Sequence, residues 1–194
     1  MKRRTNAWSG LAGEWLLSIV AWASRSSATF GASCTSMGLD ATVYCDCFET
    51  GTLKELPPCP SVFVSDDGSL DCRSEDLNTL QAFDQWLWHR ACNHPSGIFL
   101  HHRIGNLAQV GSLRSELQRE APAFPILLTK VLYCGTHAGD YLTLKDIASV
   151  KVELERLGSF VCSQQDNEEY IDWFRRQMTE LVEAATRVGK PISF

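Results

Sequence analysis

The stretch MGLDATVYCDCF, residues 37–48, carries the first clear secondary-structure signal of the chain. From Leu39 onward apolar and polar side chains alternate in part, and strand-favouring residues are frequent, so the sequence predicts a β-strand over 39–48. A glycine and a pair of prolines within 51–58 then interrupt the pattern. A strand at this position implies a sheet, against which the helical patterns farther along the chain can pack.

A hairpin and several helices are expected after this strand. SVFVS and SLDC flank the turn sequence Asp66-Asp67-Gly68, in which glycine tolerates a positive φ. Beyond residue 74, apolar side chains recur with helical spacing, and a capping residue precedes most of these runs. The expected helices span 74–93, 106–121, 124–134, 143–157 and 166–188.

Two more strands and one helix end complete the expected elements. Residues 98–103 should form a short strand, and the closing PISF should return as an edge strand with Pro191 outside the ladder. Gly158 stands where a residue of left-handed conformation ends a helix. The apolar run 124–134 is short enough that a buried strand is an alternative to a helix.

Length and composition indicate one folded core. A chain of 194 residues with 44% hydrophobic and 21% charged residues is ordinary for a globular protein. We predict an α+β fold, in which residues 37–194 form a single domain with a small mixed or antiparallel sheet packed with about five helices.

The first 36 residues differ from the rest. MKRR precedes an apolar run from Leu11 to Ala23 and a serine-rich stretch, an outline typical of a secretory signal. Glu14 interrupts this run, which is also too short to span a membrane. Because the periodic hydrophobic pattern begins just after Met37, we interpret 1–36 as a mis-assigned start or a signal-like leader and favour Met37 as the start.

The cysteines bear on the compartment. Cys34 lies in the leader, and an odd number remains, which is poor support for a disulfide framework. Several stand in apolar runs, where a cysteine behaves as a small buried hydrophobe. We therefore expect a reducing, cytoplasmic environment. The seven cysteines after residue 37 are Cys45, Cys47, Cys59, Cys72, Cys92, Cys134 and Cys162.

Charge narrows the choice of partners. Residues 37–194 contain 14 Lys and Arg against 22 Asp and Glu, a net charge of −8. Such a chain repels phosphate backbones, and its cations are scattered among acids, so we expect no nucleic-acid partner. A basic protein partner suits this charge.

Three pairs of residues have the chemistry of zinc ligands: Cys45-x-Cys47, His101-His102 and Cys134-x-x-His137. Neighbouring residues on a strand point to opposite faces, so at most one of the two histidines could join a given site. None of the spacings matches a paired C-x-x-C or an H-E-x-x-H signature. We therefore predict no metal and no cofactor.

Two polar segments form the candidate binding cluster. CGTHAGD, residues 134–140, combines a thiol, a hydroxyl, an imidazole and a carboxylate, and suits either a reactive loop or a polar turn. HHRIGN, residues 101–106, could bind an anion at a helix N-terminus, or Asn106 could simply cap that helix. The candidate residues are His101, His102, Arg103, Asn106, Cys134, His137 and Asp140.

Tryptophans suggest a protein interface. Trp88 lies about 100° around its helix from Leu87 and so off the apolar stripe, while Trp86 flanks that stripe beside Phe83. Aromatic side chains beside acids such as Asp84 suit protein contacts. A wide buried helix face is the alternative.

Four segments carry a family resemblance: MGLDATVYCDCFETG, HHRIGN, YCGTHAGDYLTLKDI and VGKPISF. With them, residues 37–194 resemble an uncharacterised bacterial family of small proteins, a resemblance that brings no catalytic residue. In size, charge and mixed α and β elements the chain is also similar in character to toxin-immunity proteins. We expect a non-enzymatic, immunity-like protein-binding module. The alternative is a small hydrolase or zinc-binding enzyme that uses HHRIGN and CGTHAGD.

Overall fold

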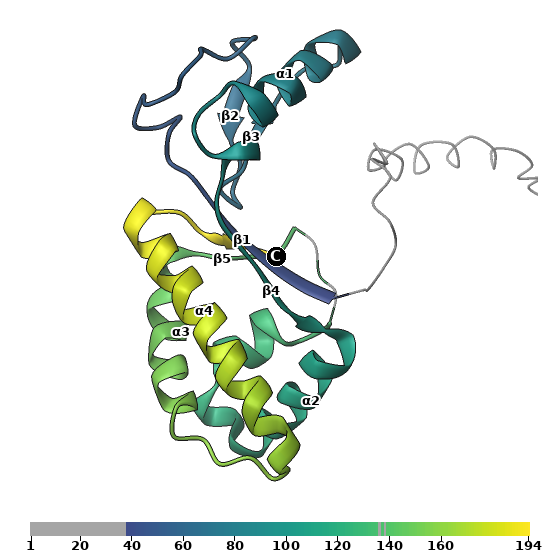
Figure 1. The fold of residues 1–194 in the computed structure, drawn as a ribbon, viewed down its shortest axis with the longest axis vertical. Helices are drawn as coiled ribbons and strands as arrows, with labels where there is room; N and C mark the ends of the chain where they lie inside the picture. Colours follow the sequence, from purple (N-terminus) through teal and green to yellow (C-terminus); the bar gives the residue numbers. More distant parts are fainter. Residues whose placement is uncertain (1–37, 136, 138) are drawn as a thin grey trace, which may run out of the picture. The chain divides into compact units, whose positions relative to one another are not determined.

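The computed structural model describes residues 38–135, 137 and 139–194. The leader expected at 1–36 lies outside these residues. The predicted α+β class is confirmed, because an antiparallel sheet packs with helices around one main core (Figure 1).

The main sheet has four strands in the order β4-β1-β6-β5, and every neighbouring pair is antiparallel. Strand β1 is central and pairs with β4 along its whole length, from Gly38 opposite Asn106 to Tyr44 opposite Ile98. A separate two-stranded sheet joins β2 and β3 across the predicted turn. The strands are β1 Gly38–Tyr44, β2 Val62–Val64, β3 Leu70–Cys72, β4 Ile98–Asn106, β5 Tyr141–Leu142 and β6 Ile192–Ser193.

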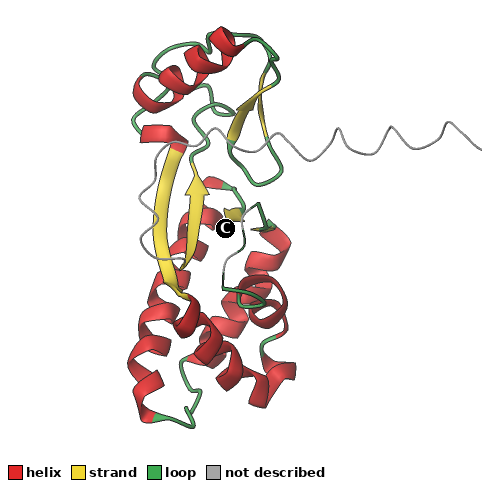
Figure 2. Cartoon of the chain, turned by 90° about the vertical axis from the view of Figure 1, so that its right-hand side faces the viewer, coloured by secondary structure: helices red, strands yellow, loops and turns green. Residues whose placement is uncertain are grey.

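Four α-helices and several short helical turns complete the described part of the chain (Figure 2). Two of these helices begin with a capping box, in which two side chains bond the free backbone N–H groups of the first turn. Asn106 and Gln109 form the box of α2, and Thr143 and Asp146 form that of α3. Among the described residues, no helix has both the length and the hydrophobicity needed to cross a membrane. The helices are α1 Leu77–His89, η1 Pro95–Gly97, α2 Leu107–Leu117, η2 Gln118–Ala123, η3 Leu127–Val131, α3 Leu144–Leu157, η4 Gln165–Asn167 and α4 Glu168–Val188.

The main core lies between the sheet and helices α2, α3 and α4. Alternate residues of β1 point into it, and Leu39, Ala41 and Val43 are fully buried there. Helix α4 contributes the predicted stripe, including Phe174 and Met178. A second, smaller apolar cluster gathers around Trp86 on α1, away from this core.

Three local expectations need correction. PISF forms β6, which is not an edge strand: it pairs with β1 on one side and with β5 on the other. Gly158 keeps a helical φ of −66°, and a Cβ there would lie 3.3 Å from the Arg175 guanidinium, so space explains this glycine better than conformation does. The helix expected over 124–134 is present but shorter, since only residues 125–131 are helical there and most of them form the π-helical turn η3.

Glu153 on α3 holds the π-helical turn in place. Its carboxylate accepts hydrogen bonds of 2.8 Å from the backbone N–H groups of Ile126 and Leu127. These donors begin the turn and have no partner within it. Burial raises the pKa of Glu153, and the two backbone donors oppose that rise.

Two glycines provide matched tests of backbone conformation. Gly189 ends α4 with φ of +66°, whereas Gly111 lies within α2, and a Cβ at either position would have open space around it to 4 Å. We expect Gly189→Ala to lower the free energy of unfolding by about 1 kcal/mol, because a Cβ strains the left-handed conformation. Gly111→Ala should raise it by about 0.5–1 kcal/mol, because alanine favours the helix. Urea unfolding of both variants measures the two changes in the free energy of unfolding. Changes of the same sign would contradict the left-handed conformation of Gly189 or the helical one of Gly111.

Candidate metal centre

Residues 45–97, here called the insertion, leave the main sheet at the end of β1 and return at the start of β4. The two ends lie side by side, because Tyr44 is the ladder partner of Ile98 and the Cys45 N–H donates to the Gly97 carbonyl at 2.8 Å. The insertion contains the β2–β3 hairpin, helix α1 and the small apolar cluster around Trp86. Both views place the hairpin and α1 together beyond the ends of β1 and β4 (Figures 1 and 2).

Four side chains with metal-binding chemistry converge where the insertion begins and ends. Cys45 and Cys47 follow β1 directly, and Cys92 and His94 follow α1 just before η1. Their ligand atoms all lie within 4.8 Å of one another. The two N-terminal cysteines are buried, and the other two ligands are half-buried. Each end of the insertion thus supplies one close pair, as structural zinc sites commonly require.

The separations between these atoms match a tetrahedron around zinc. The Sγ atoms of Cys45 and Cys92 are 3.8 Å apart, and His94 Nδ1 lies 3.4 Å from Cys47 Sγ and 3.9 Å from Cys92 Sγ. Ligands about 2.3 Å (sulfur) and about 2.0 Å (nitrogen) from one zinc ion lie about 3.8 Å apart as two sulfurs and about 3.5 Å apart as sulfur and nitrogen. The set of one imidazole and three thiols therefore fits Zn²⁺.

The surroundings of the four residues act on the thiols in opposite directions. The His94 backbone N–H donates to Cys92 Sγ at 3.4 Å. Burial raises the pKa of the Cys45 thiol to about 12, and a backbone hydrogen bond from Cys47 acts in the opposite direction. A divalent cation stabilises the thiolate form strongly enough to displace such a proton. The His94 ring packs edge-on against Phe99, which fixes its orientation toward the sulfur atoms.

This arrangement has the chemistry of a structural site. Four protein ligands fill a tetrahedral zinc shell, whereas catalytic zinc sites keep one position for water or substrate. The ligands also close the insertion at its base, since Cys45 and Cys92 are 47 positions apart in the sequence. A bound ion would therefore fix the path of the whole insertion.

Sequence reasoning identifies only half of this ligand set. Cys45-x-Cys47 stands out as a candidate pair, whereas Cys92 and His94 lie near the expected end of a helix and are not among the candidate ligands. The prediction of no metal follows from the lack of a paired C-x-x-C or an H-E-x-x-H signature. The spacing Cys92-x-His94 repeats that of Cys45-x-Cys47, and this repetition is the signal that points to a second pair. Their convergence depends on the β1–β4 register, which brings both ends of the insertion together.

The HHRIGN residues separate onto different partners. His101 Nδ1 lies 3.0 Å from Thr42 Oγ1, whereas His102 Nε2 lies 2.7 Å from the carboxylate of Glu180 on α4. Arg103 is exposed. Asn106 caps α2, so the capping alternative describes its hydrogen bonds.

The CGTHAGD segment packs near its own neighbours. The ring of His137 lies between Tyr133 and Phe194, and its Nε2 donates to the Val131 carbonyl at 2.9 Å. Its Nδ1 is 3.3 Å from the carboxylate of Asp140, without the geometry of a hydrogen bond. Cys134 is half-buried. His101 and His102 bond Thr42 and Glu180 and not residues of CGTHAGD, so these hydrogen bonds do not support an active site shared by HHRIGN and CGTHAGD.

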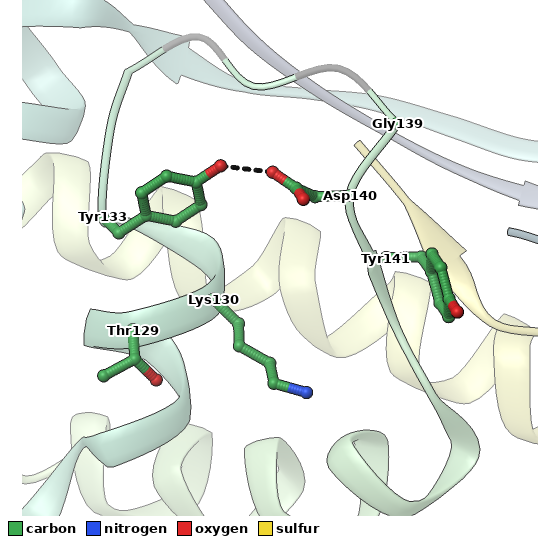
Figure 3. A pocket seen from close by; sticks show the side chains of 6 residues that line it. All are labelled: Thr129, Lys130, Tyr133, Gly139, Asp140 and Tyr141. Carbon is green, nitrogen blue, oxygen red and sulfur yellow. Dashed lines mark hydrogen bonds between the residues drawn. The ribbon is translucent and has the colours of Figure 1, made fainter. Parts of the chain in front are cut away.

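A pocket of about 360 Å³ lies beside this segment (Figure 3). Of the seven candidate residues, only Asp140 lines it, and its carboxylate accepts a hydrogen bond from the Tyr133 hydroxyl across the opening. The Lys130 ammonium binds Asp146 at 2.7 Å. Tyr133, Asp140 and Lys130 thus already have partners within the chain. Its lining residues are Thr129, Lys130, Tyr133, Gly139, Asp140 and Tyr141.

The two tryptophans of α1 differ in exposure. Trp86 is buried in the small apolar cluster, and its Nε1 donates to the Glu55 carbonyl at 3.0 Å. Trp88 keeps 59% of its surface exposed, as expected for a residue off the apolar stripe.

Comparison with protein-family models, with curated proteins and with solved structures gave no match. The metal centre therefore rests on the geometry of this chain.

Proposed function

We propose that the protein is a zinc-stabilised binding module, in which Cys45, Cys47, Cys92 and His94 hold one structural Zn²⁺ and the insertion contacts a basic protein. The observation that carries the proposal is the convergence of four ligands at the base of the insertion. The ion would supply folding free energy and order, as structural zinc does in small domains.

The charge of the insertion supports a basic partner. Residues 45–97 contain 9 Asp and Glu against 3 Lys and Arg, a net charge of −6, so most of the −8 of residues 37–194 lies in this segment. One zinc ion with three thiolates adds a further negative charge. Two of the three cations are already engaged, since Arg90 pairs with Glu55 and Arg73 lies over the Phe63 ring. Such a surface attracts and orients a cationic protein.

Helix α1 supplies the apolar contacts that such an interface needs. Leu77 and Trp88 are 79% and 59% exposed, and eleven residues at about 100° each place them on one side of the helix. Gln81 and Asp84, both exposed, lie between them on the same side. An aromatic anchor beside a carboxylate suits an arginine or lysine side chain, which can contact both.

A peptide titration tests the module. We expect the zinc-loaded full chain to bind a lysine- and arginine-rich peptide, with affinity that falls as salt rises. Asp84→Lys should weaken binding about tenfold, because it reverses a charge beside Trp88. Removing zinc with a chelator should weaken binding as well, because the metal no longer holds the two ends of the insertion together. Isothermal titration and zinc analysis of the same samples provide the measurements.

Glu183→Lys is the matched control, because it reverses an exposed carboxylate on α4, outside the insertion. It should change affinity much less than Asp84→Lys. Equal effects of the two variants would show a response to net charge alone and would contradict the proposed surface. Zinc-free protein that binds as well as zinc-loaded protein would contradict the role of the metal.

A further inference from the structure

A second pair of cysteines lies within the insertion, separate from the four metal ligands. Cys59 precedes the β2–β3 hairpin and Cys72 ends it, and their Sγ atoms are 3.0 Å apart. The Ser61 hydroxyl lies 3.4 Å from each sulfur. An approach of about 1 Å would bring the two sulfurs to the length of a disulfide bond.

We propose that Cys59 and Cys72 form a reversible disulfide, which makes the hairpin of the insertion a redox-sensitive element. The inference concerns residues that the zinc proposal does not use, and it holds whether or not a metal is bound. The oxidant would be a small-molecule disulfide of the glutathione class.

The two sulfurs differ in the way that thiol–disulfide exchange requires. Cys59 is half-buried and reachable from solvent, whereas Cys72 is only 6% exposed. Hydrogen bonds from the Cys72 thiol and then from Ser61 lower the pKa of Cys59. Burial raises the pKa of Cys72, followed by its hydrogen bond with Cys59. Cys59 is therefore the attacking thiol and Cys72 the resolving one.

The exchange balances in two steps. The Cys59 thiolate attacks one sulfur of glutathione disulfide, the S–S bond breaks, and one glutathione thiolate leaves. Cys72 then loses its proton to solvent and attacks Cys59 Sγ, which releases the second glutathione thiolate. The two cysteines are oxidised to one disulfide, and glutathione disulfide is reduced to two thiols.

The position of the pair gives the reaction a structural consequence. The hairpin between the two cysteines contacts β6 and the residues just before it, since Ser193 Oγ donates to the Asp67 carboxylate at 3.1 Å and Lys190 Nζ lies 3.4 Å from the Gly68 carbonyl. A disulfide across the base of the hairpin would restrict its motion and so strengthen these contacts.

Thiol mapping tests the inference on the full chain. Reduced, zinc-supplemented protein is equilibrated with mixtures of reduced and oxidised glutathione, trapped with N-ethylmaleimide and digested for mass spectrometry. We expect a peptide linked through Cys59 and Cys72, complete loss of maleimide labelling at both in the oxidising mixtures, and full recovery after dithiothreitol. Cys59→Ser should abolish the linked peptide, and Cys162→Ser should leave it unchanged.

Two results would overturn the inference: no Cys59–Cys72 peptide at any glutathione ratio, or disulfides that form first among Cys45, Cys47 and Cys92 while Cys59 and Cys72 remain labelled. Zinc content is measured in parallel. A chain that forms the Cys59–Cys72 disulfide without binding zinc would disprove the metal proposal alone.

Discussion

Replacing Cys92 by serine is expected to remove the zinc ion and to lower the free energy of unfolding by about 4 kcal/mol. The metal would join Cys45 to Cys92, 47 positions away. Closing a chain segment of that length removes unfolded-state entropy equivalent to about 4 kcal/mol in the loop-closure treatment of cross-links, which metal clips share. The melting temperature should fall by about 10 °C for a chain of this size. Metal analysis and urea unfolding are the two measurements.

A chelator separates loss of metal from loss of packing. It should destabilise the wild-type chain by a similar amount and have little further effect on Cys92→Ser, because the variant has no metal to lose. Cys162→Ser is the matched control, since Cys162 is half-buried and lies outside the ligand set, and it should retain one zinc ion per chain. His101→Ala should do the same. An equal response of wild type and Cys92→Ser to the chelator would show that the four residues do not act as a metal site.

Glu116→Gln is expected to flatten the acid dependence of stability and to destabilise the chain by about 3 kcal/mol at neutral pH. Glu116 lies on α2 with only 4% of its surface exposed. Its carboxylate accepts hydrogen bonds from the Ser163 hydroxyl at 2.6 Å and backbone N–H at 3.0 Å, and further ones from Asn167 and Arg119. Glutamine replaces one carboxylate oxygen, which accepts hydrogen bonds, by an amide N–H₂ group, which donates them. The groups that donate to this oxygen in the wild type then have no acceptor and stay buried and unpaired.

The pH dependence has a defined sign. The Ser163 hydrogen bonds are the main cause that lowers the pKa of Glu116 from 4.5 to about 2 in the folded chain. A depressed folded pKa contributes stability above the unfolded value, and this stability is lost as pH falls from about 4.5 to about 2. A shift of this size corresponds to about 3 kcal/mol.

Urea unfolding between pH 7 and pH 2 measures the effect. Other carboxylates with lowered pKa values, such as Asp67 and Asp146, contribute equally to both proteins and cancel in the difference. Glu183→Gln, at an exposed position on α4, should leave the profile unchanged. A Glu116→Gln profile parallel to that of the wild type would contradict the role of this carboxylate.

Local sequence patterns predicted the elements whose causes are local. The hairpin around Gly68, the Asn106 cap of α2 and the Thr143–Asp146 capping box of α3 depend on residues a few positions apart, and each is present. The long stripe of α4 likewise predicted the helix, which the structure ends at Gly189.

The metal ligands and the Glu116 network could not be found in this way, because their causes are not local. Cys47 and His94 meet only through the β1–β4 register, and Glu116 meets Ser163 across 47 positions. Trp86 shows the same limit on a smaller scale, since its indole N–H donates to the Glu55 carbonyl, 31 positions away.

The position of β6 has a consequence for protein synthesis. Strand β1 leaves the ribosome long before Ile192 and Ser193, which are its partners on one side. Until these residues emerge, β1 and β4 form a two-stranded ribbon with an unpaired edge, and β5 has no partner in the sheet. Exposed edges of this kind pair with other chains. The nascent protein therefore has a long interval in which a chaperone that covers apolar strands would protect it from aggregation.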